Sequence, residues 1–261
     1  MKTTSFFWRI LCAAVALILA MLACGIGPAT PESAPQPTAA IFPTSSPEPV
    51  PPSSPEPVPP SNTSLDGTYT THGTDMNGNT YSGSLTVKVN NSAAQVSDIV
   101  YDLSWDNGAS GAGILINDVL AASYGGPSCG AVLYAADADM TLTGIWVTLD
   151  TKAMGSEIAS PLAASSSFFA GDYSILGTNA DGSGYDGSLS IIEQGDVWQL
   201  VWIIGSDTYD GIGITSGNVL AAAYGGQGCG VVIYSVQPNG DLAGVWGMWG
   251  NNNLGTEYGT R

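Results

Sequence analysis

The sequence predicts an all-β protein with two tandem eight-stranded antiparallel up-and-down β-barrel-like domains; β-sandwiches are the alternative architecture. Three observations predict this class. The stretch LAASYGGPSCGAVLY at Leu120–Tyr134 returns as LAAAYGGQGCGVVIY at Leu220–Tyr234. Short apolar or alternating segments are separated by turn residues such as Asn-Gly and Gly-Gly, a pattern typical of strands joined by tight turns. No stretch of the repeated region shows the periodicity of a helix.

The repeat extends well beyond those fifteen residues. Residues 111–134 and 211–234 are identical at 14 of 24 aligned positions, without a gap. The offset between the copies changes only in the connections, so length differences fall between the expected strands. We therefore expect two domains, at residues 65–160 and 168–261.

Each copy carries enough strands for a complete barrel. Within one strand of the second copy, Leu200 and Trp202 share a face because side chains alternate along a strand. Eight strands with short turns favour an antiparallel meander, and closing it into a barrel removes its edges. At this level the repeat resembles the avidin–lipocalin class of barrels, as an analogy of fold without any motif of those families. The expected strands of the second copy are 171–177, 184–192, 197–204, 208–215, 218–224, 229–236, 241–248 and 254–260.

The repeated stretch itself predicts a hairpin. Leu120–Tyr124 and Cys129–Tyr134 are expected to be adjacent strands turned at Gly125-Gly126, because paired glycines suit positive φ or close backbone approach. Both faces of this hairpin are largely apolar. We therefore expect it to take part in a contact between the two domains.

Residues 1–23 are a predicted signal peptide. Two basic residues precede an uncharged apolar run, Ile10–Ala23, which is short for a membrane span and typical of a secretory signal. The run ends in Met-Leu-Ala-Cys-Gly, which resembles the lipobox of bacterial lipoproteins. That resemblance implies acylation of Cys24 and a lipid-anchored place outside the cytoplasm, on the cell membrane or the outer membrane. The alternatives are an ordinary secreted protein or an uncleaved anchor.

Residues 24–64 are a predicted proline-rich linker. They contain 13 of the 16 prolines, and SSPEPVPP occurs twice in succession. Proline fixes φ and has no N–H to donate, so this composition predicts an extended segment without a core. We expect a stalk that holds the β domains away from a membrane.

The charge balance excludes one class of partner. Beyond Cys24 there are 22 acidic residues and only three basic ones, a net charge of −19. Because no basic patch is present to neutralise phosphates, we expect no binding to nucleic acid. For the same reason, we do not expect the protein to adhere to an anionic lipid surface by charge.

Two cysteines remain once the signal peptide and Cys24 are set aside. Cys129 and Cys229 occupy equivalent positions in the two copies. An interdomain disulfide is one interpretation, since exported proteins keep disulfides, but it requires the domains to meet there in a roughly two-fold arrangement. Nothing in the sequence fixes that orientation, so two separate buried thiols are the preferred prediction.

The sequence predicts that the protein is not an enzyme and has no cofactor. It has one histidine, His72, and no GxSxG motif, so a Ser or Cys hydrolase and a His/Cys metal site are not expected. A carboxylate-dependent glycan-active enzyme ranks third among the functions considered. The carboxylates considered for it are Asp186, Asp207, Asp210 and Glu257.

Calcium binding is considered and set aside. Asp75–Asn79 and Asn179–Ser183 carry oxygen side chains at alternate positions. Glycine is fourth in each, however, whereas an EF-hand loop needs it sixth. Asn-x-Asp-Gly between strands is a turn signal in its own right, so we predict turns and no metal.

Tryptophans are the candidate ligand-binding residues. Trp105 aligns with Trp202 and Trp146 with Trp246, whereas Trp249 occurs only in the second copy, before an asparagine run. Inward tryptophans either plug a small barrel or line a mouth that stacks on a sugar or another flat ligand. By alternation we expect Trp202 and Trp246 to be buried and Trp249 to be exposed.

The expected function is therefore non-enzymatic binding of a glycan, a small molecule or a protein outside the cytoplasm. The alternative is a structural or adhesion component of the cell envelope without a ligand pocket. A roomy pocket lined by the paired tryptophans favours binding, whereas filled barrels with an apolar outer patch favour a scaffolding role.

Overall fold

A computed structural model gives the fold of residues 64–90, 99–163 and 168–261. These residues all belong to one compact unit and contain sixteen strands. Among them, no helix is long and apolar enough to cross a membrane. The predicted signal peptide, Cys24 and all but the last residue of the predicted linker lie outside the described residues.

The strands follow one another along the chain with short connections. The first eight are β1 (Gly67–Thr74), β2 (Thr80–Val89), β3 (Val100–Trp105), β4 (Ser110–Ile116), β5 (Val119–Tyr124), β6 (Gly130–Ala136), β7 (Leu142–Thr148) and β8 (Met154–Pro161). The second eight are β9 (Gly171–Thr178), β10 (Gly184–Gln194), β11 (Val197–Ile204), β12 (Asp207–Ser216), β13 (Val219–Tyr224), β14 (Gly230–Val236), β15 (Leu242–Met248) and β16 (Gly255–Thr260).

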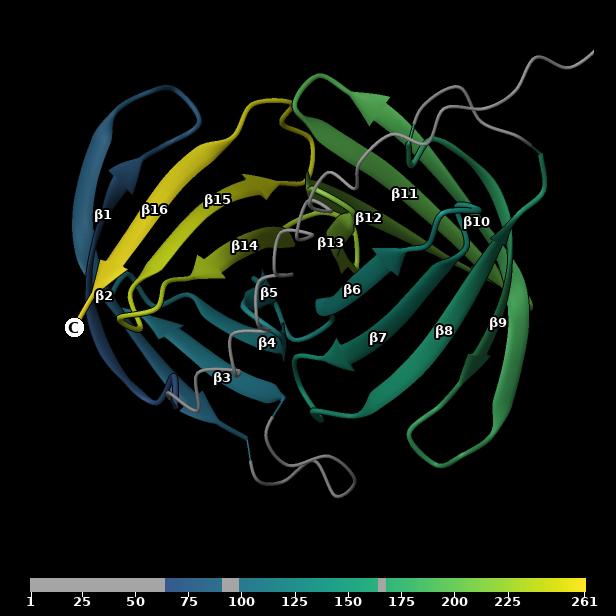
Figure 1. Ribbon diagram of the computed structural model, residues 1–261, viewed down its shortest axis with the longest axis horizontal. Helices are drawn as coiled ribbons and strands as arrows, with labels where there is room; N and C mark the ends of the chain where they lie inside the picture. The colour runs from purple at the N-terminus through teal and green to yellow at the C-terminus, as the bar shows by residue number, and fades with distance from the viewer. Residues whose placement is uncertain (1–63, 91–98, 164–167) are drawn as a thin grey trace, which may run out of the picture. The chain divides into compact units, whose positions relative to one another are not determined.

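The predicted fold class is confirmed. The strands form two closed barrels of eight antiparallel strands each (Figure 1). The strand limits expected for the second copy agree with the structure to within two residues. Turn residues delimit the strands as expected: Gly78 and Gly182, for example, adopt φ of 82° and 84° in equivalent turns, where a residue with a Cβ is disfavoured.

The barrels do not coincide with the sequence repeats. Barrel 1 consists of β1–β5 and β14–β16, whereas barrel 2 consists of β6–β13. Barrel 2 is thus one continuous segment, 130–224, inserted between β5 and β14. The limits 65–160 and 168–261 mark the repeats but not the barrels, because each repeat gives five strands to one barrel and three to the other.

The prediction of a hairpin between Leu120–Tyr124 and Cys129–Tyr134 is wrong. β5 pairs with β14, so that Tyr124 lies opposite Gly230, and β6 pairs with β13, so that Tyr224 lies opposite Gly130. The two copies of this stretch are nearly identical. The exchanged pairings therefore bring together the same residue types that a hairpin within each repeat would bring together.

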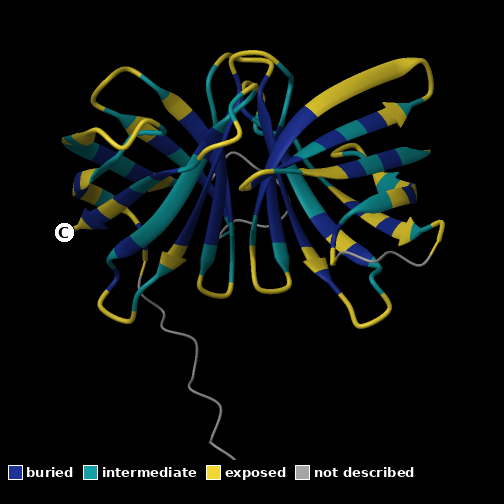
Figure 2. Cartoon of the chain, turned by 90° about the horizontal axis from the view of Figure 1, so that it is seen from above, coloured by how far each residue is buried: buried dark blue, intermediate teal, exposed yellow. Residues whose placement is uncertain are grey.

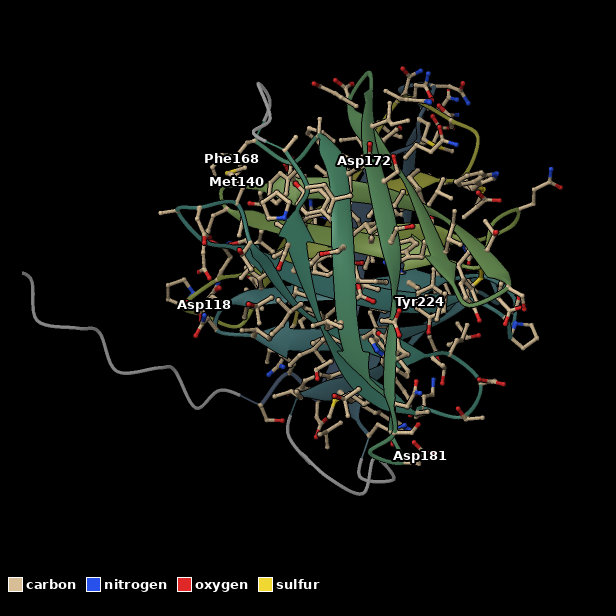
Figure 3. All side chains as sticks on the ribbon, turned by 90° about the vertical axis from the view of Figure 1, so that its right-hand side faces the viewer. Asp118, Met140, Phe168, Asp172, Asp181 and Tyr224 are labelled. Atoms are coloured by element: carbon tan, nitrogen blue, oxygen red, sulfur yellow. A yellow bond between two sulfur atoms is a disulfide. The ribbon has the colours of Figure 1, made fainter. Side chains whose placement is uncertain are left out.

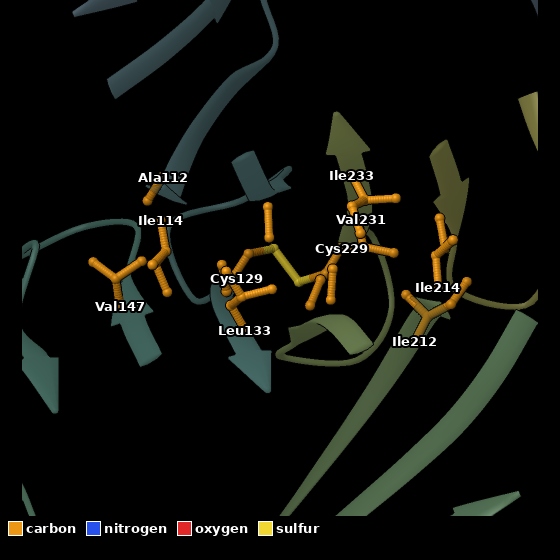
Figure 4. Packing of buried hydrophobic residues seen from close by; sticks show 14 of the residues in the cluster. Ala112, Ile114, Cys129, Leu133, Val147, Ile212, Ile214, Cys229, Val231 and Ile233 are labelled. Atoms are coloured by element: carbon orange, nitrogen blue, oxygen red, sulfur yellow. A yellow bond between two sulfur atoms is a disulfide. The ribbon is translucent and has the colours of Figure 1, made fainter. Parts of the chain in front are cut away.

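A disulfide joins the two crossovers between the barrels. Cys129 and Cys229 are bonded, with their Cα atoms 5.6 Å apart (Figure 4). The crossovers run against each other: a Cβ at Gly125, whose φ is 134°, would lie 2.2 Å from the Gly228 carbonyl oxygen. The preferred prediction of separate buried thiols is therefore wrong. The strand exchange supplies the two-fold meeting point that the sequence did not reveal.

Three buried clusters account for the core, and Figure 2 shows burial concentrated where the barrels meet. The first cluster lies between the barrels and draws residues from both, including Ile114, Leu133, Ile212 and Ile233 around the disulfide (Figure 4). The other two clusters fill the interior of barrel 2 and of barrel 1. The contact between domains expected from the repeated stretch is thus present, and it is built from paired strands rather than hairpins.

A buried tyrosine closes one end of each barrel interior, and in barrel 2 a separate cavity of about 260 Å³ lies at this end, lined by Met140, Asp172 and Tyr173 among others. In barrel 1 the buried Tyr69 donates its hydroxyl to the Leu65 carbonyl oxygen at 3.0 Å, and in barrel 2 Tyr173 donates to the Phe169 carbonyl oxygen at 2.9 Å. Both contacts lie near the start of the strand that carries the tyrosine. The opposite end of each barrel is less completely filled, and there the candidate site lies.

Candidate ligand-binding site

Each barrel holds one cavity at the end opposite the closed one, about 320 Å³ in barrel 1 and about 370 Å³ in barrel 2. Figure 3 looks at barrel 2 from outside, with Met140 and Phe168 toward the closed end and Asp181, in the β9–β10 turn, at the opposite end. The lining of the barrel 1 cavity includes Tyr81, Trp105, Tyr124, Tyr234, Trp246 and Glu257. Five of the equivalent residues line the barrel 2 cavity, namely Tyr185, Trp202, Tyr224, Trp146 and Glu157, and the sixth, Tyr134, lies behind them and donates to Glu157.

A buried glutamate lies at the base of the barrel 2 cavity. Glu157, on β8, is only 4% exposed. Its Oε1 accepts hydrogen bonds from the Tyr134 hydroxyl and, at 3.3 Å, from Trp202 Nε1. Its Oε2 accepts a hydrogen bond from the Tyr185 hydroxyl at 2.9 Å. Three neutral donors thus hold the carboxylate in one orientation.

Barrel 1 repeats the three donors to the carboxylate, although Trp202 Nε1 in barrel 2 also lies 3.0 Å from the Tyr134 hydroxyl and the Tyr81 hydroxyl in barrel 1 also lies 3.1 Å from the Thr256 carbonyl oxygen. Glu257, on β16, is 5% exposed. Its Oε1 accepts from the Tyr234 hydroxyl and from Trp105 Nε1 at 3.0 Å, and its Oε2 accepts from the Tyr81 hydroxyl at 3.0 Å. The two sites therefore have the same donor set in the same order.

A second tryptophan in each site fixes the outer tyrosine. Trp146 Nε1 donates to the Tyr185 hydroxyl at 3.0 Å, and Trp246 Nε1 donates to the Tyr81 hydroxyl at 3.1 Å. These tyrosines can then direct their own protons to the glutamate. The network leaves little rotational freedom to any polar group that faces the cavity.

Both repeats contribute to each site because the strands are exchanged. In barrel 1, the first repeat supplies Tyr81 from β2, Trp105 from β3 and Tyr124 from β5. The second repeat supplies Tyr234, Trp246 and Glu257 from β14–β16. The Tyr124 ring lies flat over Gly230 on the partner strand: a Cβ there would lie 2.2 Å from the ring. Tyr224 lies over Gly130 in the same way, at 2.1 Å. Only glycine leaves room for these rings.

Burial sets the protonation of the site. Burial raises the pKa of Glu157, and its three hydrogen bonds oppose that shift. Burial, together with the neighbouring glutamate, raises the pKa of Tyr81 and of Tyr185 well above the usual range for tyrosine. The tyrosines therefore remain hydrogen-bond donors at any physiological pH.

The aromatic rings of barrel 1 stand nearly perpendicular to one another. Trp105 and Tyr124 have ring centroids 5.8 Å apart at 61°, Tyr124 and Trp246 are 6.3 Å apart at 75°, and Tyr81 and Trp246 are 6.4 Å apart at 70°. Edge-to-face contacts of this kind are favourable geometries for aromatic pairs. Four rings thus form a connected wall beside the carboxylate.

The rims of the two cavities differ. The barrel 1 rim includes Asp75 and Asn107, whereas the barrel 2 rim has Asn179, Ile204 and Tyr209. The barrel 2 wall continues outward, because the Tyr209 and Tyr224 rings are 6.4 Å apart in an edge contact. Barrel 1 is therefore more polar and more acidic at its mouth, and barrel 2 is more aromatic.

The structure places the predicted tryptophans in two different environments. The four paired residues line the cavities: Trp105 and Trp246 in barrel 1, Trp146 and Trp202 in barrel 2. Trp202 is buried and Trp246 is half-buried. Trp249 is also half-buried, but it packs against the cluster between the barrels and lines neither cavity. Trp249 is therefore half-buried rather than exposed, and it lines a separate, smaller cavity of about 130 Å³ together with Trp198 and Gly250.

The residues at the centre of both sites are not evident from the sequence pattern. Glu157 and the six tyrosines were not singled out, and Glu257 was considered only as one of many acids. A signal was present, since each of these residues has an identical counterpart in the other copy. That signal was obscured because matched tyrosines are also expected of any repeated barrel core.

The other candidate acids do not converge on a site. Glu257 lies in barrel 1, whereas Asp186, Asp207 and Asp210 belong to strands of barrel 2 and line neither cavity. The predicted turn at Asp75 is present: Asp75 Oδ1 accepts hydrogen bonds from the backbone N–H groups of Asn77 and Asn79, both at 2.8 Å. That carboxylate therefore has a turn-forming role.

Comparisons with protein-family models, with curated proteins and with solved structures found no match to this chain. The resemblance to avidin and lipocalins consequently stays at the level of barrel architecture. The two cavities themselves are therefore the basis for inferring a function.

Proposed function

We propose that this chain is a lipid-anchored, extracytoplasmic, non-enzymatic binding protein in which each barrel takes up one small organic ligand. One observation carries the proposal: two matched cavities, each lined by two equivalent tryptophans, two equivalent tyrosines and an equivalent buried glutamate, with a third tyrosine that is Tyr234 in barrel 1 and Tyr209 in barrel 2. An aromatic wall with a few fixed polar groups is the usual composition of a small-molecule site.

The size of the cavities supports a small ligand. Volumes of about 320 and 370 Å³ fall at the lower end of the range for sites that bury most of an organic molecule. A monosaccharide-sized or single-ring compound fits this range better than an oligosaccharide or a folded partner. The proposal therefore narrows the ligand to a small molecule.

The arrangement supports binding more than scaffolding. A barrel that serves only as a scaffold gains stability from a fully apolar interior, whereas a buried carboxylate with three donors adds a desolvation penalty. Such a group is nevertheless present in both interiors. A role in holding a ligand accounts for it, since rigid polar groups lower the entropic cost of binding.

The location rests on the N-terminal sequence. The lipobox-like end of the apolar run and the proline-rich segment support acylation at Cys24 and display on a stalk. Intact-mass measurement of the mature protein tests this part. A mature N-terminus without acylation at Cys24 would contradict the anchor while leaving the ligand sites unaffected.

A ligand screen on the full chain tests the binding function. Small organic compounds and monosaccharides are added while tryptophan fluorescence and thermal unfolding are followed, and hits are titrated by calorimetry. We expect two ligand sites per chain. Trp146→Phe is expected to lower the affinity of the barrel 2 site, and Trp246→Phe that of the barrel 1 site, each by about fivefold.

Trp249→Phe is the matched control, because this tryptophan lies at the cluster between the barrels. It is expected to leave both affinities unchanged. Binding that none of the three variants alters, or the absence of any ligand in a broad screen, would contradict the proposed function.

A further inference from the structure

The buried glutamates point to one chemical class of ligand. We infer that both cavities bind a small organic cation, specifically a protonated amine that carries at least one N–H and an apolar or aromatic group. The ammonium lies against Glu257 in barrel 1 and against Glu157 in barrel 2. This inference rests on the proposed ligand-binding function and specifies its ligand.

The charge of the residues that line the cavities favours a cationic ligand. Of the described residues that line the two cavities, none is a lysine, arginine or histidine. Two basic side chains have partners away from the cavities: Lys152 Nζ lies 2.7 Å from Asp102, and Arg261 donates to the Tyr69 hydroxyl at the closed end of barrel 1. A buried carboxylate is costly unless a positive charge compensates it. A cationic ligand supplies that charge.

Each glutamate has an acceptor position that no donor among the described residues occupies. A carboxylate oxygen accepts about two hydrogen bonds. In both sites Oε1 has two donors, a tyrosine and a tryptophan, whereas Oε2 has one tyrosine donor. One acceptor position on Oε2 is therefore left for a ligand. An N–H of a protonated amine satisfies it and neutralises the charge in the same contact.

The aromatic wall of each cavity also favours a cation. Trp105, Tyr124 and Trp246 line the barrel 1 cavity together with Glu257, and Trp202 and Tyr224 line the barrel 2 cavity together with Glu157. Aromatic faces attract cations, and several rings around one site favour an ammonium over a neutral group of the same shape. An anionic ligand would face both this wall and the carboxylate, and would be repelled by the latter.

The field of the whole protein favours the same class. The part of the chain beyond Cys24 has a net charge of −19, which raises the local concentration of small cations and speeds their association at low ionic strength. This effect is general and does not select a site. Selection comes from the glutamate and the rings.

A charge series on one scaffold tests the inference. Benzylamine, benzyl alcohol, benzoate and benzyltrimethylammonium are titrated by calorimetry into the full chain. We expect benzylamine to bind about tenfold or more tightly than benzyl alcohol, at two sites per chain. The quaternary compound, which lacks an N–H, is expected to bind more weakly than benzylamine, and benzoate is expected not to bind.

Single substitutions assign the sites. Glu157→Gln and Glu257→Gln preserve side-chain volume and are each expected to reduce the number of benzylamine sites from two to one. The unmodified barrel is the internal control in each variant. Asp186→Asn removes an exposed carboxylate that lines neither cavity and is expected to leave both sites intact.

The outcomes separate the two proposals. Equal binding of benzylamine and benzyl alcohol at two sites would overturn the cation inference and leave the ligand-binding function standing. Binding of benzoate that is tighter than binding of benzylamine would also overturn the cation inference. If neither these compounds nor any in the broad screen bind, the proposed function itself fails. Should a glutamine variant fail to fold, the charge series on the unmodified chain still decides the inference.

Discussion

Barrels 1 and 2 share the base of their cavities and differ at the rim. The glutamate, three tyrosines and two tryptophans occupy equivalent positions in both, with the same hydrogen-bond pattern around the glutamate. The connection after the inner tryptophan is three residues longer in barrel 2, counted from Trp105 to Gly111 and from Trp202 to Gly211. That lengthened hairpin brings Tyr209 over the mouth of barrel 2.

The comparison separates two roles within one site. The base is held by residues on strands, where register fixes their geometry, and it defines what kind of group is bound. The rim is formed by turns and strand ends, which accept insertions and substitutions at little cost. We expect the two barrels to recognise the same chemical group and to prefer different substituents on it.

The largest expected effect comes from cutting the chain at barrel or repeat boundaries. Residues 130–224 hold all of barrel 2 and are expected to fold as a monomer with a single ligand site, at lower stability because the cluster between the barrels is exposed. Residues 168–261 hold five strands of one barrel and three of the other. Two copies are expected to exchange β14–β16 and form a dimer.

Light scattering coupled to size exclusion measures the masses of both fragments, and circular dichroism measures their strand content. A folded monomer of 168–261 would show that the segment 225–229 closes a hairpin as readily as it crosses between barrels. An unfolded 130–224 would show that barrel 2 depends on its neighbour.

The inner tryptophans are expected to differ in their contribution to stability. Trp202 is 4% exposed, whereas Trp105 is half-buried beneath the shorter hairpin. Trp202→Ala is expected to lower the free energy of unfolding by about 3–5 kcal/mol, and Trp105→Ala by about half as much. Urea unfolding of both variants measures the difference. Equal losses would show that Tyr209 and the longer hairpin add no protection to Trp202.

Removing the disulfide is expected to destabilise both barrels together. The bond between Cys129 and Cys229 spans 100 residues, and opening a loop of that length lowers stability by about 2–5 kcal/mol. Thermal unfolding of the double variant Cys129→Ser/Cys229→Ser measures this loss, and added reductant should not change it further. If only one of the two ligand sites were lost, the crossovers would be less tightly coupled than the structure indicates.

A smaller effect is expected in the pH dependence of stability. Burial raises the pKa of Glu157 in the folded protein, so the folded state binds this proton more tightly than the unfolded chain does. The contribution of Glu157 is fully present below its unfolded pKa of about 4.3 and is lost as pH rises through its folded pKa. Glu157→Gln is therefore expected to gain stability relative to the unmodified chain as pH increases through that window.

Urea unfolding from about pH 4 to about pH 7 measures this difference, with Asp186→Asn as the control for the loss of one exposed charge. A stability difference that stays constant with pH would contradict the raised pKa of Glu157.

The smallest expected effect comes from the rim. Asp75→Asn gives barrel 1 the residue that barrel 2 carries at Asn179, and is expected to weaken cation binding in barrel 1 by about twofold, with the effect vanishing at high salt. Asn179→Asp is the reciprocal change and is expected to strengthen cation binding in barrel 2 by a similar factor. Calorimetry at two salt concentrations tests the pair, and a loss above tenfold would assign Asp75 to the base of the site.

Much of the fold was predictable because it depends on local pattern. Alternation and turn residues placed the strands of the second copy within two residues, and strand number with the need to remove edges indicated closed barrels. The exchange of β14–β16 was not predictable. With nearly identical partners available, the pairing energies of the hairpin and of the crossover are alike, and the sequence of β5 gives no preference between β6 and β14.

The site was predictable only in part. The paired tryptophans were found because they are few and repeated. Glu157 was not, because its meaning depends on burial among Tyr134, Tyr185 and Trp202, which come from three strands of two repeats. Trp249 was misjudged because it lies in the turn after β15, where it packs against the cluster between the barrels rather than facing solvent. Both errors come from tertiary relations that the sequence pattern of a single strand does not contain.

The insertion of barrel 2 into barrel 1 also fixes an order of events during synthesis. Barrel 2 is complete once residue 224 has emerged, whereas β1 has no partner on one side until β16, at residues 255–260, is made. The first five strands must therefore wait as an open sheet with two unpaired edges, which is the state most prone to pairing with other chains. Under the proposed export, the N-terminal strands cross the membrane first, so this waiting period falls during translocation. Chaperones that shield open sheet edges are consequently the factors on which its yield should depend most.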